Sequence, residues 1–198
     1  MLLNPEFEAN FEEFGDFNTR IKRNGDVVLA HRIREALETK APMQLGSKKN
    51  LDHGISVPLY LLTQNKPNVK IIPLYYSDLD LKAHYDFGKL LKKEIVKNDE
   101  NIAIIASGDL SHRISKESPA GYSPKGKKFD KKLLEYLKKK NNNAIIEFDE
   151  KLIVAAAECG LRSIVLLLGI MHKIQHEPVL LSYEAPFGIG YMIMNMEL

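Results

Sequence analysis

The fold of this chain is constrained most by residues 101–113, where an apolar run stops abruptly at a group of turn-forming residues. Residues 102–106 are β-branched and small apolar residues, the pattern of a strand buried on both faces in an α/β sheet. Ser107, Gly108 and Asp109 favour a turn, and open α/β folds bind ligands at the carboxyl ends of their strands. The sequence therefore places His112 near the mouth of a cleft.

Length and composition predict one soluble domain over residues 1–198, with 44% hydrophobic and 27% charged residues. A formal net charge of +2 does not indicate a nucleic-acid partner. The single cysteine excludes an internal disulfide and favours a reducing, cytoplasmic location. No apolar run approaches the roughly 18 residues that a membrane span needs, so no membrane partner is expected.

The order of predicted elements gives the fold class. Residues 69–76 form a second predicted strand, and an amphipathic helix over residues 80–97 connects it to residues 102–106, which implies a parallel pair. Residues 178–183 and 189–196 are predicted to pair antiparallel at the sheet edge. The predicted fold is an α/β domain with a mainly parallel central sheet flanked by helices. Further helices are predicted at residues 27–40, capped by Asp26, and at 57–62, 129–140, 144–157 and 164–174, and an irregular segment is predicted at residues 7–17.

Two further segments carry candidate functional residues. Gly54 permits a turn and Pro58 suits the first turn of a helix, so His53 lies at a loop-to-helix junction where Asp52 can orient its ring. Helix capping is the structural alternative for His53. A Gly- and Pro-rich loop at residues 118–126, which includes Tyr122, could lie over the cleft.

Glu158 and Cys159 stand side by side between two apolar segments. A glutamate is seldom buried without a partner or a metal, so its placement favours a functional role. An ion pair with Arg162, four residues further on, is the structural alternative.

Five ordered motifs resemble one protein family. They are Leu-Asp-His-Gly-x-x-Val-Pro-Leu at residues 51–59, Ser-Gly-Asp-Leu-Ser-His-Arg at 107–113, Ala-Gly-Tyr at 120–122, Glu-Cys-Gly at 158–160 and Tyr-Glu-Ala-Pro-Phe-Gly at 183–188. Together they are similar to the LigB-type class III extradiol ring-cleavage dioxygenases. The greatest similarity is to the AmmeMemoRadiSam branch, which includes the Memo-like proteins.

The resemblance implies a non-haem Fe(II) site that brings a catechol-type aromatic substrate and O₂ together. It implies an acid/base role for His112 and a pocket-lining role for His53. It implies Glu158 as the carboxylate ligand, with Cys159 as the competitor because Memo-like relatives place a cysteine ligand at or beside this position. The substrate-binding candidates in the same motifs are Asp52, Ser107, Asp109 and Tyr122.

The chain departs from the family pattern upstream of His53, where the family has two metal-binding histidines and this chain has only His31. The resemblance therefore predicts a chain truncated relative to the family domain, with weak Fe(II) binding. A Memo-like protein that keeps the cleft without ring cleavage is the alternative function. A homo-oligomer is left open.

Overall fold

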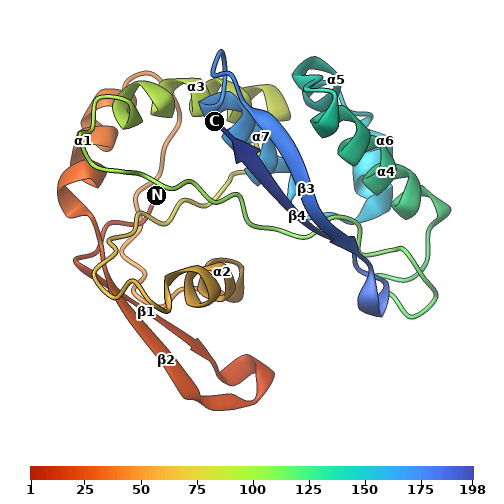
Figure 1. Cartoon of the computed structure of the whole chain (residues 1–198), viewed down its shortest axis with the longest axis horizontal. Helices are drawn as coiled ribbons and strands as arrows, with labels where there is room; N and C mark the ends of the chain where they lie inside the picture. The colour runs from red at the N-terminus through yellow and green to blue at the C-terminus, as the bar shows by residue number, and fades with distance from the viewer. The chain divides into compact units, whose positions relative to one another are not determined.

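The computed structural model describes residues 1–198, which form seven α-helices and two antiparallel strand pairs (Figure 1). The chain divides into two compact units, each with its own apolar core. The first unit comprises residues 1–77 and 93–107, and the second comprises residues 78–92 and 108–198. No helix combines the length and the apolar character that crossing a bilayer requires.

The first unit begins with a β-hairpin. Strand β1 (Glu6–Phe11) pairs antiparallel with β2 (Asp16–Asn24), with the short 3-10 helix η1 (Glu12–Phe14) between them. The prediction of an irregular segment at residues 7–17 is therefore wrong, because these residues belong mainly to two paired strands. Polar and apolar residues alternate along β1, and this period of two buries Phe7 and Ala9 while Glu6 and Glu8 are half-buried.

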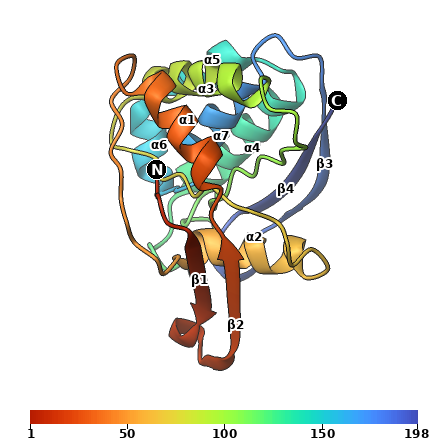
Figure 2. The ribbon, with the colours of Figure 1, turned by 90° about the vertical axis from the view of Figure 1, so that its left-hand side faces the viewer.

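Helices α1 (Val27–Leu37) and α2 (His53–Thr63) complete the first unit, and α2 lies beside β1 (Figure 2). Asp26 Oδ1 accepts a hydrogen bond from Leu29 N, which confirms the predicted cap of α1. The core of this unit contains Leu2, Phe7, Ala9, Ile21, Leu51 and Leu59.

Pro58 lies inside α2, further along than the predicted first turn, because the helix starts at His53. A proline has no N–H to donate to the carbonyl four residues earlier, which here belongs to Gly54. Ser107 Oγ donates to that Gly54 oxygen at 2.5 Å. The serine hydroxyl thus replaces the hydrogen bond that the proline cannot make, which stabilises an interrupted helix.

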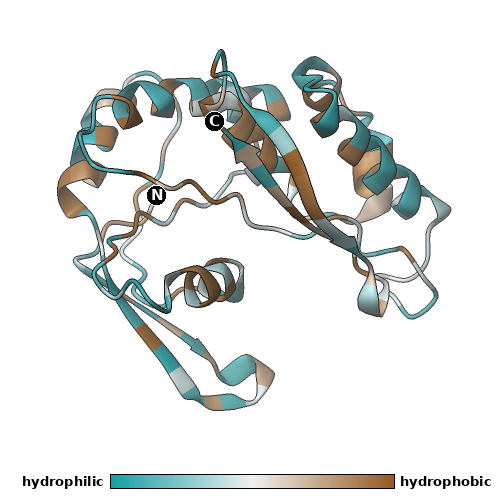
Figure 3. Ribbon diagram, in the orientation of Figure 1, coloured by the Kyte–Doolittle hydropathy of each residue, from teal (hydrophilic) through white to brown (hydrophobic).

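The second unit contains most of α3 (Leu81–Ile95) and the elements from α4 onward. These are α4 (Pro124–Lys138), α5 (Asn142–Ile146), α6 (Glu150–Ala156), α7 (Leu161–Ile170), β3 (Glu177–Glu184), the 3-10 helix η2 (Pro186–Gly188) and β4 (Tyr191–Glu197). The apolar character of α7 is visible in Figure 3, and residues of α7 and α4 supply much of the core. Phe129, Leu133, Leu161 and Val165 are fully buried there.

The mainly parallel central sheet predicted from the sequence is not seen. Residues 102–106 form no strand and Ile105 is 52% exposed, while residues 69–76 contribute one bridge, from Ile71 to Gly25. A strand is defined by its partner, and an apolar run alone does not supply one. The antiparallel pair predicted at the C-terminus is confirmed by β3 and β4.

Candidate functional site

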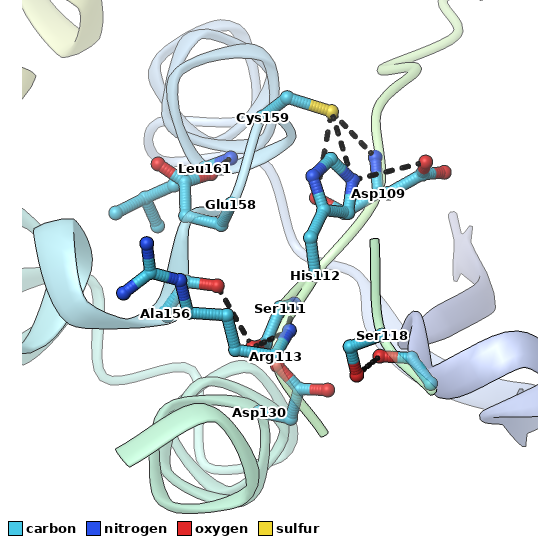
Figure 4. A network of polar contacts seen from close by, with 11 residues as sticks. Asp109, Ser111, His112, Arg113, Ser118, Asp130, Ala156, Glu158, Cys159 and Leu161 are labelled. Atoms are coloured by element: carbon cyan, nitrogen blue, oxygen red, sulfur yellow. Dashed lines mark hydrogen bonds and ion pairs between the residues drawn. The ribbon is translucent and has the colours of Figure 1, made fainter. Parts of the chain in front are cut away.

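Asp109, His112 and Cys159 form a cluster in the second unit, with one potential ligand atom of each lying within 4.8 Å of the others (Figure 4). His112 Nε2 lies 3.3 Å from Asp109 Oδ2 and 4.0 Å from Cys159 Sγ. All three side chains are half-buried, so they are shielded by protein yet open to small molecules. We call these residues the Asp–His–Cys cluster.

Backbone hydrogen bonds between two loops hold the cluster together. Asp109 and His112 lie in the segment that follows Ser107, and Cys159 lies in the connection between α6 and α7. The N–H groups of Cys159 and Gly160 both donate to Asp109 O, at 3.2 and 2.9 Å. Asp109 N donates in return to Cys159 Sγ at 3.2 Å. The carboxylate and the thiol are thereby fixed to each other through their own main chains.

Two glycines allow these loops to approach so closely. Gly108 has a φ of +151°, and a Cβ atom added there would lie 2.5 Å from Gly160 Cα. A Cβ atom added to Gly160 would lie 2.9 Å from Asp109 O. Any larger residue would push the loops apart, because non-bonded carbon atoms pack at about 3.5–4.0 Å.

Glu158 does not join the cluster. Its Oε2 accepts a hydrogen bond from Leu161 N at 2.6 Å, at the start of α7, where a carboxylate also complements the helix dipole. Burial raises the pKa of Glu158, although this hydrogen bond opposes the shift. The Nε of Arg162 donates to Leu79 O, at 3.4 Å. In this geometry Glu158 stabilises a helix end, and Cys159 occupies the position that faces His112.

The protonation state of Cys159 is set by its surroundings. Burial raises the pKa of the Cys159 thiol, and the negative charges of Asp109 and Glu158 raise it further, against the opposing hydrogen bond from Asp109 N. A thiol with a raised pKa is protonated and unreactive near neutral pH. Binding a metal ion would reverse this preference, because metals bind the thiolate.

We therefore expect alkylation of Cys159 by iodoacetamide to rise with pH around a higher midpoint in the folded protein than in the same protein unfolded in urea. The reason is that only the thiolate reacts, and the fold opposes its formation. Cys159 is the only cysteine, so mass spectrometry of the intact chain reports this site alone. A midpoint equal to or below that of the unfolded chain would contradict the prediction.

His53 and Asp52 lie at the start of α2, in the first unit. The His53 side chain is exposed, its Nδ1 lies 3.2 Å from Glu13 Oε1, and its ring meets Phe14 edge-on. Asp52 caps α2 by accepting from Ile55 N. Burial, followed by a hydrogen bond to Asp52, raises the pKa of Tyr75 to about 12.

The other two substrate-binding candidates also lie outside the cluster. Ser107 belongs to the first unit and uses its hydroxyl on Gly54 O. Tyr122 belongs to the second unit, is 56% exposed, and precedes the Ser123 cap of α4. Of the residues predicted as functional, the structure thus brings together Asp109, His112 and Cys159.

An open groove of about 770 Å³ in the second unit lies along α4 and does not include the cluster. Its lining residues are Ile114, Ser115, Lys127, Lys131, Leu134, Glu135, Lys138, Tyr183 and Ala185. The groove therefore does not represent the cleft predicted beside His112.

The donors of the Asp–His–Cys cluster suit a transition-metal ion. A carboxylate oxygen, an imidazole nitrogen and a thiolate sulfur bind such ions at about 2.0–2.3 Å, so donors around one ion lie roughly 3–4 Å apart. The 3.3 and 4.0 Å separations fit this spacing. The set differs from the two histidines and one carboxylate of non-haem iron oxygenases in replacing one imidazole with a thiol. It therefore fits a divalent ion that accepts sulfur, such as Zn(II) or Co(II), better than the iron set that the resemblance implies.

Sequence reasoning missed a buried carboxylate behind the cluster. Asp130 on α4 is 1% exposed, and its Oδ1 accepts from Ser111 N while its Oδ2 accepts from Tyr183 Oη. Its position in the sequence could have indicated this burial. Asp130 falls on the same helical face as Phe129 and Leu133 in an otherwise lysine-rich helix. An acidic residue on an apolar face indicates a buried polar contact.

Comparison with known proteins adds a family and a fold. A family model described as the catalytic LigB subunit of aromatic ring-opening dioxygenase matches residues 4–194. Protein CA_C1420 of Clostridium acetobutylicum is 42% identical over 147 residues, which make up 74% of this chain and 31% of that protein. The match thus covers about a third of that relative. The crystal structure of an uncharacterized protein, JW3007 from Escherichia coli K12, matches with a TM-score of 0.70 and 17% identity, over 98% of this chain and 81% of the other, which shows a shared fold.

Proposed function

Because this chain belongs to the LigB family of catalytic subunits of aromatic ring-opening dioxygenases, we propose that it binds a divalent transition metal at the Asp–His–Cys cluster and acts there on a catechol-type aromatic with O₂. The observation that carries the proposal is the convergence of Asp109, His112 and Cys159 within 4.8 Å. The partners proposed are a small aromatic molecule and O₂, with no nucleic acid or membrane. The iron that the family resemblance implies is one of the ions to be tested.

A metal bound at this cluster would supply Lewis acidity and a place for a diol and O₂ to meet. The chain's own residues would do the rest. Asp109 Oδ2, 3.3 Å from His112 Nε2, orients the imidazole ring and favours a proton on that nitrogen when no metal binds it. Ring opening by a dioxygenase places both atoms of O₂ in the product, so it needs no further reductant. A substrate hydroxyl must still lose its proton, and His112 can accept it only in the alternative in which Asp109 and Cys159 hold the metal without the imidazole.

A second candidate is a Memo-like protein that keeps the metal site without ring cleavage. The specific observation that favours it is the thiol: Cys159 faces His112, while the neighbouring carboxylate of Glu158 is committed to Leu161 N. A donor set with one imidazole and one thiolate suits an ion held for binding or structure as well as one that activates O₂. The two candidates share the site and differ in turnover.

Oxygen consumption separates the candidates. The chain is loaded with Fe(II) without air, and O₂ uptake is followed with a series of substituted catechols. Uptake that depends on the catechol and yields a ring-opened product supports the dioxygenase. Metal bound in stoichiometric amounts without uptake supports the Memo-like candidate. Failure of every ion tested to bind would contradict both.

His112→Gln tests the role of the imidazole. We expect this substitution to lower metal affinity by about 10–100-fold and to abolish turnover, because it removes one of the three donors. Metal affinity is measured by competition with a coloured chelator. Retained metal with lost turnover would show instead that His112 moves protons and is not a ligand, the role that the sequence resemblance implies.

A further inference from the structure

Asp130 is a buried carboxylate held by neutral donors. It is 1% exposed, and its partners are Ser111 N at 2.9 Å and Tyr183 Oη at 2.7 Å. Burial raises its pKa, although both hydrogen bonds oppose the shift. Burying a carboxylate costs free energy unless hydrogen bonds compensate for the lost hydration. The contacts of Ser111 show what this carboxylate holds in place.

Ser111 lies between the two cluster residues Asp109 and His112 in the sequence, and its side chain is fully buried. Its N–H donates to Asp130 on α4, its Oγ donates to Ala156 O at the end of α6, and its carbonyl accepts from Gly190 N just before β4. Figure 4 shows Asp130 next to Ser111, with the Asp–His–Cys cluster close by. Contacts with three elements thus fix this one residue.

The position of Ser111 also determines the positions of the cluster residues Asp109 and His112. His112 N donates to Ala156 O at 3.1 Å, so it shares an acceptor with the Ser111 hydroxyl. Asp109 lies two residues before Ser111, and its carbonyl oxygen accepts a hydrogen bond from Cys159 N at 3.2 Å. A displacement of Ser111 would therefore move both neighbours relative to Cys159.

The Asp130 carboxylate and the Ser111 side chain are closely packed against neighbouring backbone. A Cβ atom on Gly190 would overlap Asp130 Oδ2, and one on Gly126 would lie 2.5 Å from Ser111 Oγ. Removing the Asp130 carboxylate would deprive the Ser111 N–H of the acceptor that fixes its position.

We propose that Asp130 is a positioning residue that sets the separations among Asp109, His112 and Cys159 by anchoring the Ser111 amide, with Tyr183 holding the carboxylate in place. The role of Asp130 in metal binding rests on the proposed function. Its effect on the position of the loop that carries Asp109 and His112 does not depend on a metal and can be measured in the metal-free protein.

The experiment compares Asp130→Ala, Asp130→Asn and a control on the exposed side of the same helix, Glu135→Gln, whose side chain pairs with Lys139. The first readout is the alkylation rate of Cys159 at one fixed pH in the metal-free protein, below the onset of unfolding. The second is Co(II) affinity, together with the thiolate-to-cobalt charge-transfer absorption.

We expect Asp130→Ala to speed alkylation by about 10-fold and weaken Co(II) binding by about 10–100-fold, as loss of an outer-shell partner does. Asp130→Asn keeps an oxygen that can accept from Ser111 N, so its alkylation rate and Co(II) affinity should stay within about 3-fold of the parent values. Glu135→Gln should leave both unchanged. A purely structural role predicts a lower unfolding temperature for Asp130→Ala with both readouts unchanged, and that result would overturn the proposal.

Asp130→Ser covers the case in which the alanine protein does not fold, because serine stays polar yet is too short to reach the Ser111 amide. It should reproduce the faster alkylation, and an unchanged rate in the folded serine protein would overturn the proposal. If the parent chain binds no Co(II), the proposed metal function fails, while the alkylation comparison still decides whether Asp130 positions the loop.

Discussion

Replacing Cys159 with alanine is expected to weaken the binding of Zn(II) or Co(II) by about 100-fold or more. The thiol supplies one of three donor atoms that lie within 4.8 Å of one another, and loss of even an outer-shell partner costs about 10–100-fold in affinity. The fold should survive, because the sulfur accepts a hydrogen bond from Asp109 N that water can replace on a half-buried loop. Affinity is measured by competition with a chromophoric chelator, and folding by circular dichroism.

Glu158→Gln is the matched control, because it alters the adjacent side chain. Glutamine keeps an oxygen that can accept from Leu161 N, so the end of α7 should stay intact. We expect a change in affinity below about 3-fold, the size of removing a nearby charge that does not touch the ion. The opposite pattern, with affinity lost in Glu158→Gln and kept in Cys159→Ala, would make Glu158 the ligand and exclude the cluster as the site.

The start of α1 was predictable from the sequence because capping is a local property. Asp26 precedes an amphipathic run, and it caps α1 as predicted. Asp52 precedes His53 in the same way, and its carboxylate caps α2. The sequence interpretation gave Asp52 the task of orienting His53, whereas the His53 ring contacts Glu13 and Phe14.

Strand pairing was not predictable from residues 102–106, because it depends on segments far away in the sequence. The run of isoleucines and alanines fits a buried strand, yet it forms no ladder and leaves Ile105 exposed. The alternation in β1 was a clearer signal, since a period of two along residues 6–9 indicates one buried face. It was overlooked because scattered aromatics and acidic residues also fit an irregular segment.

The candidate site was predictable in its residues but not in its geometry. The motif around residues 107–113 points to Asp109 and His112, and the pair Glu158 and Cys159 offered two ligands without a choice between them. The choice depends on where α7 begins, because the Leu161 N–H has no acceptor within the helix and donates to the Glu158 carboxylate. The first residue of α7 depends on tertiary packing, which the sequence pattern alone does not reveal.

Gly108→Ala is expected to destabilise the second unit by about 3 kcal/mol or more and to abolish metal binding. Its φ of +151° lies in a region that only glycine adopts readily, and the new Cβ atom would lie 2.5 Å from Gly160 Cα, against backbone that cannot rotate away. Because Gly108 and Gly160 mark the crossing of the two loops that carry the cluster, relief of the overlap must separate Asp109 from Cys159.

Gly121→Ala separates strain of the backbone from overlap of the loops. Gly121 also has a positive φ, +77°, but a Cβ atom there would meet nothing within 4 Å. The control should therefore cost only about 1–2 kcal/mol, the price of a left-handed alanine, and leave metal affinity unchanged. Urea unfolding followed by circular dichroism gives the free energy of unfolding of each variant. An equal decrease in the free energy of unfolding of the two variants would contradict the prediction. It would show that the close approach of Gly108 to Gly160 adds no cost beyond that of an alanine at positive φ.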